Sequence, residues 1–126
     1  MNALVIALAL SQTASLGQQF DLTCTGESVL SRAGRQPVRE ITSQRYRLDL
    51  ERMEWCTGDC TLLHDLQDAS SHQITFLNSK DVFNVVSRIT GEWQTYSGDD
   101  RSYSWATTGR CDLAPFSGFP TYQTRF

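Results

Sequence analysis

Hydrophobic and polar residues alternate along much of the chain, which is the two-residue period of half-buried β-strands. The alternation is strict in residues 20–25 and again in residues 45–51, where Tyr46, Leu48 and Leu50 are expected to face the core. Shorter strands are predicted at residues 53–56, 61–66, 73–77, 82–89, 92–96 and 103–106. Turn residues separate these runs, and no run has a helical period. The pattern predicts an all-β fold, a small antiparallel meander of about seven or eight strands that forms a barrel or a sandwich.

Two segments lack the strand pattern. Residues 27–44 are polar and include Gly34 and Pro37, so this segment is expected to be a long, mobile loop. Residues 114–120 are interrupted by two prolines and a glycine and are not expected to form a strand. The two phenylalanines of that segment are instead predicted to pack over an open end of the sheet.

The first residues differ from all that follow. An unbroken apolar run at residues 3–10 precedes small and polar residues up to Gly17, which is typical of a secretory signal peptide. The run is shorter than the roughly 20 apolar residues that span a bilayer, so stable membrane insertion is not expected. The alternative is a buried N-terminal strand or helix. We therefore expect a signal peptide at residues 1–17 and a single periplasmic or secreted domain at residues 18–126.

Charge and composition exclude some partners. The chain has 11 basic and 14 acidic residues, a formal net charge of -3, and neither sign forms a long block. Because no basic stripe is present, nucleic acid is not an expected partner. The balance of 40% hydrophobic and 20% charged residues is that of an ordinary globular domain.

Four cysteines in a small exported chain predict two disulfides. Three pairings are possible. The sequence favours Cys56 with Cys60, which a three-residue turn brings together, and Cys24 with Cys111, which would tie the first strand to the last.

An alternative interpretation involves metal. Cys56, Cys60, His64 and His72 follow the spacing C-x3-C-x3-H-x7-H, and their side chains are suitable ligands for tetrahedral zinc. A small hydrolase centred on the same four residues is the other form of this alternative. Zinc sites usually place two residues between the first cysteines, and an exported protein meets oxidant first, so the disulfide interpretation is preferred. Accordingly, no catalytic residue, metal or cofactor is predicted.

Five aromatic residues are candidates for a binding surface, because large amphipathic rings are common at protein and ligand contacts. They are Trp55, Trp93, Tyr96, Tyr103 and Trp105. The alternative is that they pack in the core and along the strands. The ligand would be an unknown protein or a small molecule, and the expected function is non-catalytic binding, or an inhibitor-like role, in the periplasm.

Several stretches carry a resemblance to known proteins. They are FDLTCTG at residues 20–26, RYRLDL at 45–50, Trp55-Cys56 with Cys60, RITGEW at 88–93, GRC at 109–111 and APFSGFP at 114–120. Together these stretches resemble a family of short exported bacterial proteins of unknown function, which implies export and disulfides but no activity. A weaker likeness, through Phe20, Cys24, Gly26 and Cys111, is to periplasmic inhibitors of C-type lysozyme, and it implies no inhibitory residues here.

Overall fold

The structure, a computed structural model, describes residues 18–99 and 102–120 of the chain. The predicted signal peptide at residues 1–17 lies outside this part. The described part contains nine strands: β1 (Gln19–Arg32), β2 (Val38–Asp49), β3 (Glu54–Thr57), β4 (His64–Asp65), β5 (Asp68–Ala69), β6 (Gln73–Asn78), β7 (Val82–Ser87), β8 (Glu92–Asp99) and β9 (Tyr103–Ala114). No helix occurs among these residues, so the prediction of an all-β fold is confirmed.

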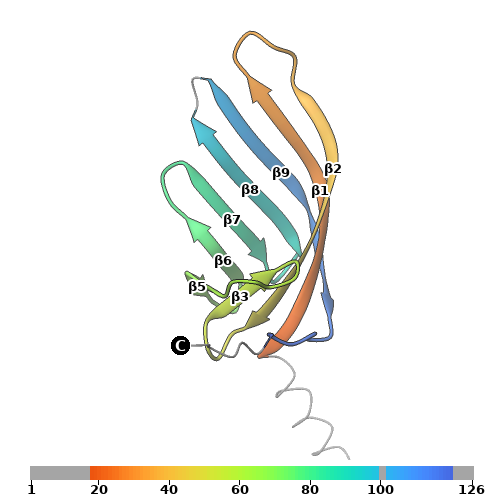
Figure 1. Ribbon diagram of the computed structural model, residues 1–126, viewed down its shortest axis with the longest axis vertical. Coiled ribbons are helices and arrows are strands. Elements are labelled where there is room, and N and C mark those ends of the chain that lie inside the picture. The colour runs from red at the N-terminus through yellow and green to blue at the C-terminus, as the bar shows by residue number, and fades with distance from the viewer. Residues whose placement is uncertain (1–17, 100–101, 121–126) are drawn as a thin grey trace, which may run out of the picture.

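All neighbouring strands are antiparallel, and together they form one sheet in the order β4-β3-β2-β1-β9-β8-β7-β6-β5. The sheet curls into a half-barrel (Figure 1). β9 is the middle strand of this order, and its neighbour β1 pairs with β2 on one side and with β9 on the other along most of its length. In Figure 1 the β1–β2 connection, the end of β8 and the start of β9 lie at the upper end, and the start of β1 and the end of β9 lie at the lower end.

The two end strands of the sheet are consecutive in the chain and meet at the lower end. β4 pairs with β3, and β5 pairs with β6. Between them, the Leu66 N–H donates to the Met53 carbonyl at 2.8 Å, and the Gln67 N–H donates to the Thr75 carbonyl at 3.1 Å. Residues 64–69, which we call the closing segment, therefore close the half-barrel at this end, where β3 and β6 approach each other.

The core fills the lower half of the concave side. Its buried members come from β1, β2, β6, β7, β8 and β9, with Leu66 from the closing segment. Tyr46 stacks on Phe76 with ring centroids 4.4 Å apart, and Trp93 meets Tyr46 edge to face at 6.2 Å. Above this cluster the concave side becomes polar. There the Ser28 hydroxyl hydrogen-bonds Thr42 and Thr107, at 2.6 and 2.7 Å.

The prediction of a long loop at residues 27–44 is wrong. These residues continue β1 to Arg32 and begin β2 at Val38, so only residues 33–37 turn. The hydrophobic alternation is missing because this upper half of the sheet covers no core, and most of its side chains are exposed. Backbone pairing between β1 and β2 holds the hairpin together, and the Ser28–Thr42 hydrogen bond and the Arg39–Glu27 ion pair add to it.

Two other boundaries also differ from the prediction. The strand predicted at residues 61–66 is reduced to β4, whose two residues begin the closing segment and pair with β3. The last strand extends from the predicted residues 103–106 to Ala114, because β1 offers it a full-length partner. Residues 115–120 are not a strand, as predicted.

Candidate functional site

A cavity of about 310 Å³ opens at the lower end of the half-barrel. We call it the lower pocket. Its lining residues come from β1, β6, β7, β9 and the β7–β8 turn: Phe20, Leu22, Ile74, Val86, Ser87, Arg88, Gly91, Cys111 and Leu113. Most of these side chains are apolar, so the cavity extends the core to the molecular surface.

Strand register determines which side chains form the walls. Leu22 lies opposite Leu113 in the β1–β9 pair, and Ile74 lies opposite Val86 in the β6–β7 pair. These residues share the concave face with the core. Leu22, Ile74 and Val86 are buried, whereas Leu113 is 75% exposed at the end of its strand. The pocket thus has buried apolar walls and one exposed apolar residue beside them.

Gly91 keeps one wall of the pocket open. Its φ is 78°, and a Cβ added there would lie 2.9 Å from the Cys111 carbonyl oxygen. The Gly91 N–H donates to the Ser87 carbonyl at 2.9 Å, and the Gly91 carbonyl accepts from the Cys111 N–H at 2.8 Å. Glycine is required because other residues rarely adopt a positive φ and because space here is limited. The turn is therefore fixed without a side chain that would fill the cavity.

Polar groups of the pocket lie on the same turn. Arg88 is exposed and its Nη1 donates to the Ser70 carbonyl at 2.8 Å. The Ser87 hydroxyl accepts from the N–H groups of Ile89 and Thr90, at 3.2 and 3.1 Å. A guanidinium and a hydroxyl thus accompany the apolar walls.

A second cavity, of about 560 Å³, lies beside the lower pocket under the C-terminal segment. Phe20 and Leu113 line both cavities. Pro115 and Phe116 form the far wall, and Phe116 packs edge to face on Phe119 with centroids 5.2 Å apart. The phenylalanines of this segment therefore border an open end of the sheet.

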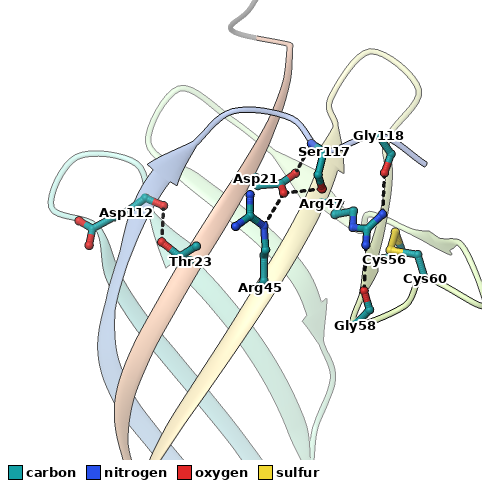
Figure 2. A network of polar contacts seen from close by, with 10 residues as sticks. All are labelled: Asp21, Thr23, Arg45, Arg47, Cys56, Gly58, Cys60, Asp112, Ser117 and Gly118. Atoms are coloured by element: carbon teal, nitrogen blue, oxygen red, sulfur yellow. Dashed lines mark hydrogen bonds and ion pairs between the residues drawn. A yellow bond between two sulfur atoms is a disulfide. The ribbon is translucent and has the colours of Figure 1, made fainter. Parts of the chain in front are cut away.

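A buried carboxylate holds this C-terminal segment (Figure 2). Asp21 is fully buried, and its oxygens accept from Arg45 Nε at 2.6 Å and from the Ser117 hydroxyl at 2.6 Å. The Ser117 N–H also donates to Asp21, at 3.2 Å. Three donors compensate the buried charge, as a carboxylate removed from water requires. The wall of the second cavity is therefore anchored to β1.

A second arginine links that segment to the small disulfide loop (Figure 2). Arg47 donates to the Gly118 carbonyl at 3.0 Å and to the Gly58 carbonyl at 3.1 Å. Gly58 lies in the turn between Cys56 and Cys60, whose sulfurs are joined. This arrangement is structural, because the guanidinium is used on carbonyls within the chain.

The four cysteines form two disulfides, Cys24 with Cys111 and Cys56 with Cys60. This is the pairing that the sequence favours. Because the sulfurs of Cys56 and Cys60 are bonded to each other, they offer neither thiolate ligands for zinc nor a nucleophile for a hydrolase. Among the described residues, no group of three or more His, Cys, Asp or Glu side chains is placed to hold a metal ion.

The two histidines of the zinc alternative lie on separate elements. His64 is exposed on β4, and its ring lies over Trp55 with centroids 4.6 Å apart. His72 is exposed in the turn between β5 and β6, and its Nδ1 is 3.0 Å from the Ser71 hydroxyl. The structure therefore gives no support to a four-ligand site made of these residues.

The five aromatic residues proposed as a binding surface do not form one patch. Trp93 is buried in the core, and Trp55 packs partly buried against it. Tyr96 stacks with Phe83, and this pair lies on the strand face opposite to Trp93. The remaining two, Tyr103 and Trp105, lie at the upper end of β9.

One aromatic side chain has a perturbed pKa. Burial raises the pKa of the Tyr46 phenol above its ordinary value of 10.0, and side-chain hydrogen bonds with Asn84 and Trp93 oppose the rise. Asn84 Nδ2 donates to the phenol oxygen at 2.9 Å, and Trp93 Nε1 donates to Asn84 Oδ1 at 3.0 Å. This chain of hydrogen bonds satisfies the polar atoms that enter the core from β2, β7 and β8.

The Tyr46 pKa predicts a loss of stability at alkaline pH. Because the folded-state pKa is raised, Tyr46 stabilises the folded state below about pH 10, and this contribution is lost as the pH rises through the folded-state pKa. We expect a spectroscopic phenolate titration of the wild type to contain a step above pH 10 that Tyr46→Phe lacks. Unfolding in urea should show a steeper alkaline loss of stability in the wild type. Identical titration curves for the two proteins would contradict the assignment.

The comparisons with known proteins found no match for this chain. No family model, curated protein or solved structure matches the chain. Within residues 18–99 and 102–120, no helix has the length and apolar character needed to cross a membrane.

Sequence reasoning missed the lower pocket. Its lining residues come from five parts of the chain, and each belongs to an ordinary strand or turn pattern. The available signal was Leu113, an apolar residue between the charged Asp112 and the helix- and strand-breaking Pro115. An apolar residue at such a strand end is informative only when the register of its neighbours is known.

Proposed function

We propose that the protein is a non-catalytic binding domain, exported to the periplasm or secreted, that takes a small and largely apolar ligand into the lower pocket. The observation that carries this proposal is the cavity of about 310 Å³ itself, with its apolar walls and few polar groups. Ligand sites in proteins are typically concave and apolar, with a small number of polar groups that orient the ligand.

The exposure of Leu113 supports an occupant. This residue is 75% exposed, although it lines both the lower pocket and the second cavity. A ligand that covers Leu113 would remove apolar surface from water. This burial would stabilise the complex by about 25 cal/mol per Å² of apolar surface covered. An elongated apolar ligand that passes Leu113 would use both cavities.

The polar groups of the lower pocket favour a ligand with an acidic or hydrogen-bonding end. Arg88 lines the pocket, and one of its nitrogens donates to the Ser70 carbonyl. A guanidinium has five N–H donors, so others can serve a ligand carboxylate or hydroxyl. Ser87 offers a hydroxyl on the same turn.

Export is supported by the two disulfides, since such bonds persist in oxidising compartments. The resemblance to short exported bacterial proteins also supports export, but it implies no particular ligand.

The test is the binding of a fluorescent dye, anilinonaphthalene sulfonate, whose apolar rings and anionic group match the pocket. We expect saturable binding to the wild type and displacement by decanoate. Leu113→Arg should weaken the dye affinity about tenfold or more, because it places a hydrated charge at the mouth in place of apolar surface.

The matched control is Leu62→Arg, which changes another exposed leucine, 64% exposed, that lines neither of the cavities described above. It should bind the dye as the wild type does. The proposal is contradicted if the wild type shows no saturable binding, or if both variants bind equally well.

A further inference from the structure

The upper half of β2 is an open edge of the sheet. β2 pairs with β1 from Val38 to Asp49, but β3 covers only the stretch from Tyr46 to Asp49. Among the described residues, no other strand pairs with residues 38–45 on that side. Such an edge is a template for another strand, because it presents unpaired backbone donors and acceptors.

The direction of these backbone groups follows from the register. The Leu50 N–H donates to the Gln18 carbonyl, so the even-numbered residues of β2 direct their backbone groups toward β1. The β1–β2 register is continuous, and the alternation therefore holds along the strand. The N–H and C=O groups of Arg39, Ile41 and Ser43 consequently point away from β1, into the open edge.

The opposite side of the sheet is protected, which makes the open edge of β2 notable. β5 pairs with the first part of β6. At the other end of β6, the Gln67 side chain donates to the Asn78 carbonyl at 3.2 Å and accepts from the Asn78 N–H at 2.8 Å. A single amide side chain thus takes the place of a neighbouring strand there.

Charged side chains often protect an edge strand, but the two arginines in the open part of β2 bind carboxylates of β1 instead. Arg45 Nε binds Asp21 at 2.6 Å, and Arg39 Nη1 binds Glu27 at 2.7 Å. Both carboxylates belong to β1, the strand on the far side from the edge. Between the two ion pairs lies Ile41, which is 73% exposed.

We propose that a second copy of this chain pairs with this edge, with the two β2 strands antiparallel about a two-fold axis at Ile41. Ile41 is the one apolar residue between the two ion pairs, and a symmetric contact would cover its side chain with the Ile41 of the other copy. In this register Ile41 faces Ile41, Arg39 faces Ser43 and Glu40 faces Thr42. No like charges are opposed.

Neighbouring registers are less favourable. An axis at Thr42 would place Arg39 opposite Arg45, and an axis at Glu40 would place that carboxylate opposite itself. Like charges directly across a strand pair are destabilising. The charge pattern therefore selects the axis at Ile41, and the contact would join two half-barrels into one continuous sheet. This inference is independent of the lower pocket.

Sedimentation velocity over a range of protein concentrations tests the proposal. The wild type should show a monomer–dimer equilibrium. Ile41→Pro removes the N–H that crosses the axis in each copy, and an edge strand tolerates proline where its N–H faces solvent. We expect the dimer dissociation constant to rise about tenfold or more, through the loss of two hydrogen bonds.

Two controls accompany this variant. Ile41→Val keeps the N–H and should dimerise like the wild type, whereas Ile89→Arg changes an exposed isoleucine on the β7–β8 turn and should also dimerise. If Ile41→Pro fails to fold, Ile41→Arg opposes two cations across the axis and should be monomeric. A wild type that is monomeric at all concentrations overturns the proposal, as does a dimer that Ile89→Arg disrupts or Ile41→Arg leaves intact.

Discussion

Replacing both Cys24 and Cys111 by alanine is expected to lower the free energy of unfolding by about 4–5 kcal/mol, since the disulfide joins residues 87 positions apart in sequence. In the chain-entropy description, this long loop restricts the unfolded chain strongly, and removal of the bond releases it. The two residues also lie directly opposite each other where β1 and β9 pair, close to the lower pocket. Urea unfolding of the wild type and the double variant, followed by tryptophan fluorescence, measures the difference.

The other disulfide provides the control. Cys56 and Cys60 are four positions apart, so the same description gives about 2 kcal/mol for the variant in which both are alanine. Both double variants replace two buried cysteine side chains by smaller methyl groups, so the two losses of stability can be compared directly. Equal losses of stability in the two double variants would show that loop length does not govern the effect.

A second large effect is expected for Gly109→Ala, which should reduce the free energy of unfolding by about 3 kcal/mol or more. Gly109 on β9 lies opposite Gly26 on β1, and a Cβ at residue 109 would overlap the Thr25 carbonyl oxygen and the Gly26 Cα. These are backbone atoms in one of the two longest strand pairs of the sheet. They can move only if the pairing beside the Cys24–Cys111 bond is distorted.

Gly34→Ala separates this steric effect from the general consequence of losing a glycine. Gly34 has a φ of 72° in the β1–β2 turn, and an added Cβ would have no atom within 4 Å. The expected loss is about 1–2 kcal/mol, from the left-handed backbone conformation alone. Thermal and urea unfolding of both variants provide the comparison, and a loss for Gly34→Ala as large as that for Gly109→Ala would contradict the steric explanation.

The fold could be predicted from the sequence where one face of a strand is buried and the other is exposed to solvent. Tyr46 and Leu48 show the alternation clearly because they face the packed lower half of the half-barrel. The same strand was missed between Val38 and Gln44, because neither of its faces meets a core there. Alternation of hydrophobic and polar residues indicates burial of one face, and a strand that covers no core leaves no such signal.

The candidate sites were less accessible to sequence reasoning. The disulfides could be predicted from the number of cysteines and from the expected export of the chain. The lower pocket, by contrast, depends on Leu22 meeting Leu113 and on the backbone of Gly91, both of which are products of strand register. The binding surface was predicted from the aromatic character of five side chains, which says nothing about where they point. The strand register places Trp93 and Tyr96 on opposite faces of the sheet, so they cannot contact the same ligand.

The closing segment at the lower end has a mechanical consequence. Its hydrogen bonds on the β3 and β6 sides fix the curvature of the sheet at one end only. The upper parts of β1, β2, β8 and β9 extend beyond this segment. Bending at the free end would leave the clamped end, and with it the shape of the lower pocket, almost unchanged. Strand addition along the upper part of β2 and ligand binding below would therefore be mechanically decoupled events in one small domain.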